Sequence, residues 1–118
     1  MEFNTSVPIY LQVMDAIKKQ LILGILGPGE QLPSTRSLAV SYNVNPNTAA
    51  RIYKELELEN ICFTKRGLGT FVTDSEETLL KLKEPMANKV IDHFIAEMTE
   101  LGYNFSDMVK IIKERERE

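Results

Sequence analysis

The order of helix and turn signals in residues 32–72 constrains the fold of this chain more than any other feature of its sequence. Ser34 has the side chain of a helix N-cap, so a short helix should follow it. Asn45 and Pro46 then provide a cap and a first helical residue, a position where the missing N–H of proline does no harm. Residues 61–73 have strand composition on both sides of a glycine-containing tip, which predicts a β-hairpin. This order describes a winged helix-turn-helix, a fold that usually binds DNA.

The first part of the chain is expected to be mainly helical with one small hairpin wing. A stripe at helical spacing should bury one side of a first helix, and its members are Ile9, Val13, Ile17 and Leu21. The expected helices of this part span about residues 9–23, 35–42 and 46–59. Its expected strands are residues 61–64 and 70–73, with Gln31–Leu32 as a short third strand.

After residue 75 the chain changes to a long amphipathic pattern. Apolar residues spaced by three or four predict a helix over about residues 76–101, which Pro85 should kink or divide. Ser106 could cap a last helix. We therefore expect a winged helix-turn-helix DNA-binding domain over residues 1–75 and a two-helix dimerisation or effector tail over residues 76–118.

Composition narrows the class of protein. The chain has 118 residues and one cysteine, Cys62, so no internal disulfide can form and a cytoplasmic location is expected. No apolar run approaches the ~20 residues that span a bilayer, and the start of the chain lacks a secretion-signal pattern. His93 is the only histidine, and its neighbours make no metal-ligand pattern with a cysteine. We expect neither an enzyme nor a bound metal or cofactor.

The net charge of −3 by itself argues against a nucleic-acid binder. Residues 1–75, however, carry equal numbers of basic and acidic side chains, so residues 76–118 supply the whole negative balance. Within the first part, basic residues gather between the predicted second helix and the hairpin tip. A neutral domain with such a focused basic face can still bind phosphates. The acidic tail should then face away from the DNA.

The predicted third helix has a polar face opposite its apolar one, as a helix in the major groove requires. Asn47 and Arg51 lie on this face, and their side chains suit adenine, guanine or phosphate. Asn45 lies at the helix start, where N–H groups favour phosphate, although capping could be its whole role. Arg36 lies in the first turn of the preceding helix, which crosses the DNA backbone in helix-turn-helix docking. An ion pair with a surface carboxylate would also explain Arg36.

The hairpin tip is the third candidate contact. Gly67 permits a positive φ and close approach of the backbone, and Arg66 could enter a minor groove. A plain turn would explain the glycine but not the adjacent basic pair, Lys65 and Arg66. The full set of candidate DNA-binding residues is Ser34, Thr35, Arg36, Asn45, Asn47, Thr48, Arg51, Lys54, Lys65, Arg66 and Gly67.

These residues resemble the GntR family of bacterial transcription regulators, over residues 8–73 and with the loop lengths of that family. The resemblance implies that Arg36 contacts a base or phosphate, that the third helix reads DNA, and that Arg66 and Gly67 belong to the wing. Pro46 and Ala50 stand where some members carry arginines, so those guanine contacts do not carry over. The matching segments are Pro8-Ile9-Tyr10-Leu11-Gln12-Val13, Gly24-Ile25-Leu26-Gly27-Pro28-Gly29-Glu30, Leu32-Pro33-Ser34-Thr35-Arg36-Ser37-Leu38-Ala39 and Gly67-Leu68-Gly69-Thr70-Phe71-Val72.

The short tail resembles that of the YtrA-like subfamily, since it has no room for the larger ligand-binding domains of the family. The resemblance implies a homodimer that often regulates its own operon with neighbouring transporter genes. The apolar stripe of the tail supports a dimer independently, because a lone helical hairpin cannot bury all of it. Packing on the chain's own winged domain is the alternative. The candidate interface residues are Met86, Val90, Phe94, Ile95, Met98, Met108, Val109 and Ile112.

The leading hypothesis is a sequence-specific, DNA-binding transcriptional regulator. We expect a homodimeric repressor that binds an inverted-repeat operator in double-stranded DNA, with no membrane association. A small-molecule effector is a second possibility, with a pocket lined by Phe94, Tyr103, Phe105 and methionines, although such residues more often form a core. A third is a protein-interaction module that has lost DNA binding, which the net charge favours and the basic wing argues against.

Overall fold

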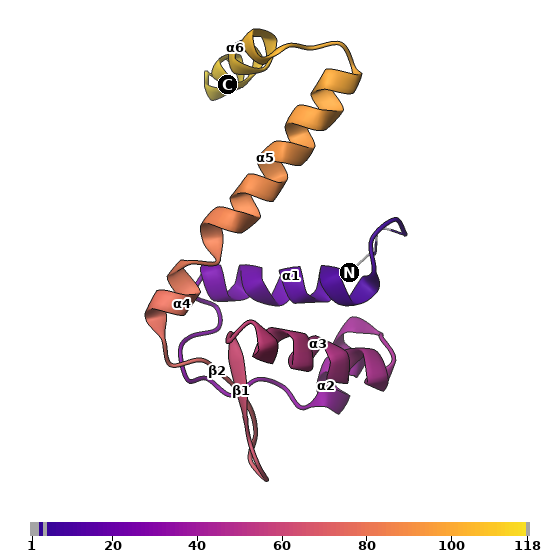
Figure 1. Ribbon diagram of the computed structural model, residues 1–118, viewed down its shortest axis with the longest axis vertical. Coiled ribbons are helices and arrows are strands. Elements are labelled where there is room, and N and C mark those ends of the chain that lie inside the picture. Colours follow the sequence, from indigo (N-terminus) through magenta and orange to yellow (C-terminus); the bar gives the residue numbers. More distant parts are fainter. Residues whose placement is uncertain (1–2, 4, 118) are drawn as a thin grey trace. The chain divides into compact units, whose positions relative to one another are not determined.

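Three helices and a hairpin pack together in the first of the two units into which the chain divides, Met1–Leu82 and Lys83–Glu118. The structure is a computed structural model, and it describes residue 3 and residues 5–117. The outer ends of the two expected domains, at residues 1, 2, 4 and 118, lie outside the described residues. The first unit contains, in chain order, α1 (Ile9–Ile22), α2 (Thr35–Tyr42), α3 (Pro46–Leu58), β1 (Cys62–Lys65), β2 (Gly69–Val72) and α4 (Glu76–Leu80) (Figure 1).

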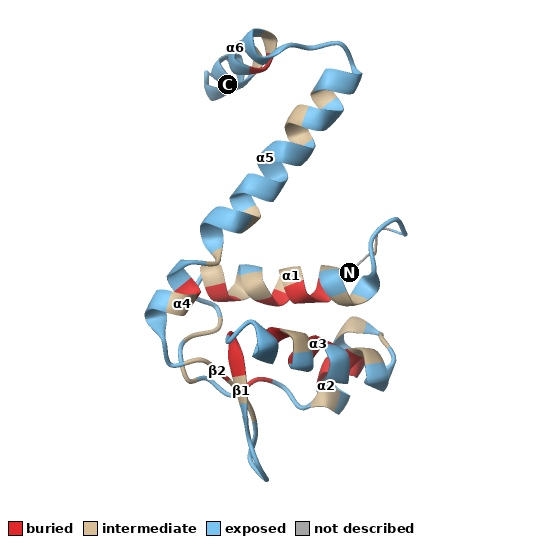
Figure 2. Ribbon diagram, viewed as in Figure 1, coloured by how far each residue is buried: buried red, intermediate tan, exposed pale blue. Residues whose placement is uncertain are grey.

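The core of the first unit lies between α1 and α3, and Figure 2 shows the buried side of α1 turned toward α3. The buried residues of α3 follow the expected helical spacing and are Ala49, Ile52, Tyr53 and Leu56. Those of α1 are Val13, Met14, Ile17 and Leu21. Ile9 was expected in this stripe, but it is the first residue of α1 and is 46% exposed. The buried stripe therefore begins one turn later than expected.

The side chains expected to cap α2 and α3 do so. The Ser34 hydroxyl accepts a hydrogen bond from the Ser37 N–H (3.1 Å), which satisfies one donor of the first turn of α2. The Asn45 side-chain carbonyl accepts one from the Asn47 N–H (2.8 Å) at the start of α3. Between the two helices Asn43 is left-handed, with φ 53°, which ends α2 and reverses the chain tightly. The caps and this turn together form the helix-turn-helix.

The wing is an antiparallel hairpin in which residues 62–65 of β1 pair with residues 69–72 of β2. The third strand expected at Gln31–Leu32 is, within the described residues, a single bridge to Phe71. The Leu32 N–H still donates to the Thr70 carbonyl (2.8 Å), so the loop before α2 is tied to the hairpin. The predicted fold class, a winged helix-turn-helix followed by a helical tail, is confirmed.

The long helix expected over residues 76–101 is divided at residues 81–82 into α4 and α5 (Lys83–Glu100). Pro85 lies in the first turn of α5, where backbone N–H groups have no acceptor within the helix. Its missing N–H therefore removes no helical hydrogen bond there, whereas the continuous helix would have placed Pro85 in its interior. The expected division occurs, and it falls shortly before the proline.

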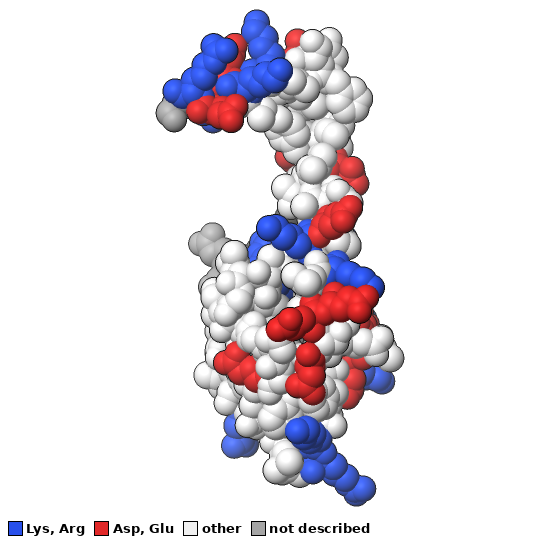
Figure 3. Space-filling view, turned by 90° about the vertical axis from the view of Figure 1, so that its left-hand side faces the viewer, with Lys and Arg blue, Asp and Glu red and all other residues white. Residues whose placement is uncertain are grey.

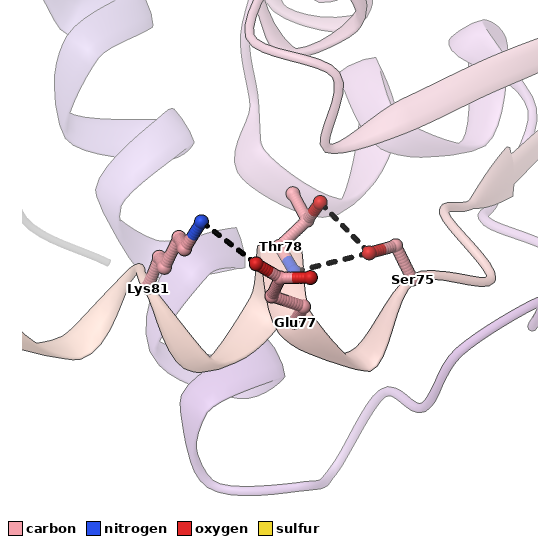
Figure 4. A network of polar contacts seen from close by, with 4 residues as sticks. All are labelled: Ser75, Glu77, Thr78 and Lys81. Atoms are coloured by element: carbon pink, nitrogen blue, oxygen red, sulfur yellow. Dashed lines mark hydrogen bonds and ion pairs between the residues drawn. The ribbon is translucent and has the colours of Figure 1, made fainter.

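The short α4 is held at both ends by local polar contacts (Figure 4). The Ser75 hydroxyl accepts hydrogen bonds from the Thr78 N–H (3.1 Å) and the Thr78 hydroxyl (3.0 Å). One turn further on, Lys81 pairs with Glu77 (3.0 Å). Leu79 joins the core of the first unit, so α4 is attached to that unit.

The second unit consists of α5 and α6 (Phe105–Glu116). Ser106 was expected to cap α6, and this is wrong because Asn104 and Asp107 form a reciprocal capping box. The Asn104 N–H donates to the Asp107 carboxylate (3.0 Å), and the Asp107 N–H donates to the Asn104 side chain (2.8 Å). Among the described residues, no helix is long and apolar enough to cross a bilayer.

Replacing the fully buried Ile52 with alanine should lower the free energy of unfolding by about 2–5 kcal/mol, because the deletion leaves a cavity between α1 and α3. Leu58→Ala is the matched control, since Leu58 lies on the same helix and is 69% exposed. Its loss should stay below about 0.5 kcal/mol. Urea unfolding followed by circular dichroism measures both variants. Equal losses would show that this side of α3 is not the core.

Candidate nucleic-acid interface

α3 presents a polar surface on the side opposite the core. Asn45, Asn47, Arg51 and Lys54 are exposed along this helix and its cap, and Thr48 is half-buried. The structure therefore places the predicted residues of the third helix on one exposed surface. An α-helix with donors and acceptors on its outer side has the size and chemistry needed to enter a DNA major groove.

The first turn of α2 brings a second group of predicted residues to the surface. Ser34 and Arg36 are exposed, and Thr35 between them is half-buried. The hydroxyl oxygen of Ser34 is occupied by its cap, as is the side-chain carbonyl of Asn45. Capping uses only the acceptor atom of the Asn45 amide, so its NH₂ group remains a donor toward solvent. Capping and a contact with phosphate are therefore compatible at Asn45.

An aromatic ring of α1 holds the side chain of Arg51. The guanidinium carbon lies 3.9 Å from the centre of the Tyr10 ring. Tyr10 is half-buried and packs against the core of the first unit. In the sequence Tyr10 is part of a segment that matches the family, and no role is predicted for it. No local signal joins Tyr10 to Arg51, because the two residues come from separate helices.

The two basic residues of the wing differ in their surroundings. The Lys65 ammonium lies 4.9 Å from the centre of the Phe71 ring and 5.6 Å from that of Phe63. The two rings stack across the hairpin with their centres 5.9 Å apart. Lys65 is therefore held along the hairpin by cation–π contacts. Arg66 is exposed at the tip, and no aromatic ring of the described residues makes a cation–π contact with its side chain.

Gln31 fixes the tip of the wing. Its side-chain amide donates a hydrogen bond to the Leu68 carbonyl (2.8 Å). A Cβ at Gly69 would lie 2.9 Å from the same amide nitrogen, and Gly69 has φ 122°. The backbone conformation of Gly69 therefore favours glycine, and a Cβ there would also displace the Gln31 amide from its present place. The sequence predicts a short strand at Gln31–Leu32 but carries no local signal for this side-chain contact.

Two carboxylates near the end of α3 contact groups other than its basic residues. Glu57 accepts a hydrogen bond from the Thr64 N–H (3.0 Å), and Glu59 pairs with Lys18 of α1 (2.9 Å). In the part of the chain that the structure describes, no ion pair involves the basic candidates, which are Arg36, Arg51, Lys54, Lys65 and Arg66. Figure 3 shows Lys and Arg side chains gathered at the projecting tip of the hairpin. No carboxylate of the described residues therefore pairs directly with the positive charge of this surface.

Cys62 and Tyr53 are buried groups that join α3 to the wing and to the loop before α2. Burial raises the pKa of the Cys62 thiol to about 12, and the negative charge of Glu57 adds to the shift. Its Sγ donates to the Tyr53 carbonyl (3.6 Å). Burial also raises the pKa of Tyr53, whose hydroxyl donates to the Pro33 carbonyl. Both groups are therefore neutral near pH 7 and act in packing.

Comparison with known proteins identifies a family and two close relatives. Residues 9–72 match the family described as bacterial regulatory proteins, gntR family. The uncharacterized HTH-type transcriptional regulator YhcF of Bacillus subtilis is 41% identical over 112 residues, which cover 95% of this chain and 93% of YhcF. The HTH-type transcriptional repressor YtrA of the same organism is 37% identical over 112 residues, which cover 94% of this chain and 86% of YtrA.

Solved structures show the same fold alone and on DNA. A GntR family transcriptional regulator from Listeria monocytogenes superposes with a TM-score of 0.83 at 35% identity, covering 95% of this chain and 98% of that one. The DNA-binding domain of AraR in complex with operator ORR3 gives a TM-score of 0.55 at 26% identity, covering 62% of this chain and 86% of that one. The winged helix-turn-helix described above thus has a counterpart bound to operator DNA.

Native Cys62 should react with iodoacetamide at pH 8 about two orders of magnitude more slowly than Cys62 in the urea-unfolded protein, because the native thiol is buried and protonated.

The pKa of Cys62 in the native protein exceeds the ordinary value of 9.0, so the native state holds this proton more tightly than the unfolded state does. The contribution of Cys62 to stability should be complete below about pH 9 and lost as the pH rises toward 12. Timed alkylation and urea unfolding at several pH values measure both effects. Equal alkylation rates in the two states would contradict the buried position.

Proposed function

This chain belongs to the GntR family of DNA-binding bacterial transcription regulators, and from that premise we propose that it is a homodimeric repressor that binds an inverted-repeat operator. The observation that carries the proposal is the basic surface formed by α2, α3 and the wing. Its basic side chains have no ion-pair partners among the described residues, so they are available to phosphates and bases.

In this proposal α3 lies in the major groove. Asn47 and Arg51 read base edges or hold phosphates, since an amide suits adenine and a guanidinium suits guanine or phosphate. Lys54, about one helical turn beyond Arg51, binds the DNA backbone as a point charge. Asn45 and Thr48 lie at the positive end of the helix, where a phosphate is favoured.

The other contacts flank α3. Residues 34–36 begin α2, and Arg36 contacts the DNA backbone or a guanine from there. Arg66 enters the neighbouring minor groove, where a narrow A·T-rich segment attracts arginine. Gly67, with φ 80°, lets the backbone of the tip approach the DNA closely. Lys65 is held on the hairpin rings and adds positive charge beside the phosphates.

The second unit provides the proposed dimer interface. α5 has no buried residue along its length, although it carries the predicted apolar stripe. Met108 of α6 is buried within the described chain, so it supports the helical hairpin and is the least available of the expected interface residues. The half-buried members of the set are Met86, Phe94, Ile95 and Met98, and the exposed ones are Val90, Val109 and Ile112. A second copy of the chain would cover this apolar surface, whose exposure to water is unfavourable in the monomer.

Dimerisation sets the form of the operator. A two-fold symmetric dimer presents two copies of α3 and therefore reads two half-sites in opposite orientations. Repression is supported by the similarity to YtrA, a transcriptional repressor that matches 94% of this chain. The operator of the present protein would lie in the promoter of its own operon, and neighbouring transporter genes would be the regulated targets.

Regulation by a small-molecule effector is a second candidate, and one feature of the second unit favours it. A groove of about 470 Å³ between α5 and α6 is lined by Phe94, Met98 and Tyr103, among others. Phe105, also expected in such a pocket, is not part of this lining and is exposed. The lining is mainly apolar, so the ligand would be apolar too. A ligand that binds there should raise the melting temperature of the protein. If dimerisation covers this groove and no tested ligand raises the melting temperature, the protein is a repressor that works without a ligand.

Arg66→Ala should weaken binding to the promoter of its own operon by about tenfold and lower the salt dependence by about one unit per protomer, because a phosphate-neutralising charge is lost. Arg36→Ala should weaken binding by a similar factor. Lys81→Ala is the control, since Lys81 lies on α4 and pairs with Glu77. Gel-shift titration at two salt concentrations with random competitor DNA measures these effects. Equal affinity for promoter and random DNA would instead favour the protein-interaction module.

Val90→Glu should convert the dimer into a monomer, because it places an unpaired charge in the proposed apolar interface. Val90 is 69% exposed in the single chain, so its substitution should leave the fold intact. Ala96→Glu adds the same charge on the same helix, but exposed Ala96 lies on the side of α5 opposite the proposed interface, so this variant should remain dimeric. Sedimentation velocity at micromolar concentration distinguishes the two states. A wild-type monomer, or a dimeric Val90→Glu variant, would overturn the interface.

A further inference from the structure

The contact between Tyr10 and Arg51 links the core of the first unit to its proposed DNA surface. Arg51 is exposed on α3, and its guanidinium carbon lies 3.9 Å from the centre of the Tyr10 ring. Tyr10 is half-buried on α1 and packs against the core, so its ring is a fixed support. The Gln12 side chain also donates to the Val7 carbonyl (2.9 Å), which fixes the start of α1 where Tyr10 lies.

The kind of partner decides what Arg51 can still bind. A carboxylate would pair with the N–H fork of the guanidinium and neutralise its charge. Glu55 lies one turn away on α3, yet no ion pair joins it to Arg51 among the described residues. An aromatic ring instead contacts the flat face of the guanidinium by cation–π attraction. The charge and the in-plane N–H donors of Arg51 are therefore left for another acceptor.

We propose that Tyr10 is a positioning residue for DNA binding, and that its ring holds the Arg51 guanidinium ready to contact a bidentate acceptor, either a phosphate or a guanine edge. This inference rests on the proposed operator binding through α3. Long arginine side chains lose rotamer freedom when they are fixed in a complex. A ring that already restricts Arg51 in the unbound protein reduces that loss, so DNA binding should be tighter than with an unsupported arginine.

The alternative role of Tyr10 is packing alone. In that case its ring would stabilise α1 against α3, and its loss would affect DNA binding only through folding or through the placement of α3 as a whole. The two roles differ in coupling. A positioning residue acts through Arg51, so its effect should disappear when the guanidinium is absent, whereas a packing residue acts equally with or without Arg51.

The test is a double-mutant cycle on the affinity for the promoter fragment of its own operon, with random DNA as competitor. Tyr10→Leu should weaken specific binding about threefold to fivefold, as expected for loss of an exposed cation–π contact. Tyr10→Phe keeps the ring and should stay within about twofold of wild type. Arg51→Lys keeps the charge but loses the planar fork and should resemble Tyr10→Leu. Arg51→Ala should weaken binding about tenfold, and adding Tyr10→Leu should then weaken it no further.

Tyr42→Leu is the matched control, because Tyr42 is a half-buried tyrosine of the same core and no arginine of the described residues stacks on its ring. Circular dichroism melts show whether each variant is folded, and Arg51→Lys tests the contact from its exposed side if Tyr10→Leu is unstable. Equal weakening by Tyr10→Leu with and without Arg51 would overturn the positioning role. So would wild-type affinity of Tyr10→Leu or of Arg51→Lys. Absence of specific binding by the wild type would overturn the proposed operator function itself.

Discussion

The burial of one side of α3 is the constraint on which the rest of the structure depends. Ile52 and Leu56 are fully buried, and the hydroxyl of Tyr53 binds the Pro33 carbonyl in the loop before α2. Helical side chains repeat every 3.6 residues, so fixing these residues inward fixes the polar residues outward. The exposed surface of α3 is therefore a direct consequence of its core. A rotation of α3 that exposed Ile52 would also bury Asn47 and move it away from any partner.

Two polar contacts define how α1 lies along α3. Tyr10 contacts Arg51, and further along both helices Lys18 pairs with Glu59 (2.9 Å). Tyr10 precedes Lys18 on α1, and Arg51 precedes Glu59 at the C-cap of α3, so the two helices run in the same direction. The Glu59 contact also occupies a carboxylate that would otherwise compete for the basic side chains of α3. Residues 1–75, whose charges balance, can thus present a locally positive surface, because Glu57 and Glu59 contact groups other than these basic side chains.

Sequence reasoning located the elements of the first unit because their boundaries are local. Ser34 and Asn45 cap helices through bonds to residues two or three positions away, which a sequence pattern reveals. The cap of α6 was misassigned because two polar residues compete there, and the reciprocal bond between Asn104 and Asp107 decides between them. The support of Arg51 could not be foreseen in this way, because only the packing of α1 on α3 brings Tyr10 to it.

The hydrogen bond from the Gln31 side chain to the Leu68 carbonyl positions the tip of the wing by a contact that does not involve α3. The direction of the hairpin tip depends on a side chain in the loop before α2, whereas the direction of α3 depends on the core. Substitutions at residue 31 can therefore change the direction of the wing without disturbing α3, the helix proposed to enter the major groove. Minor-groove and major-groove preferences can diverge independently among descendants of such a chain, so new operators become accessible by single steps that preserve the fold.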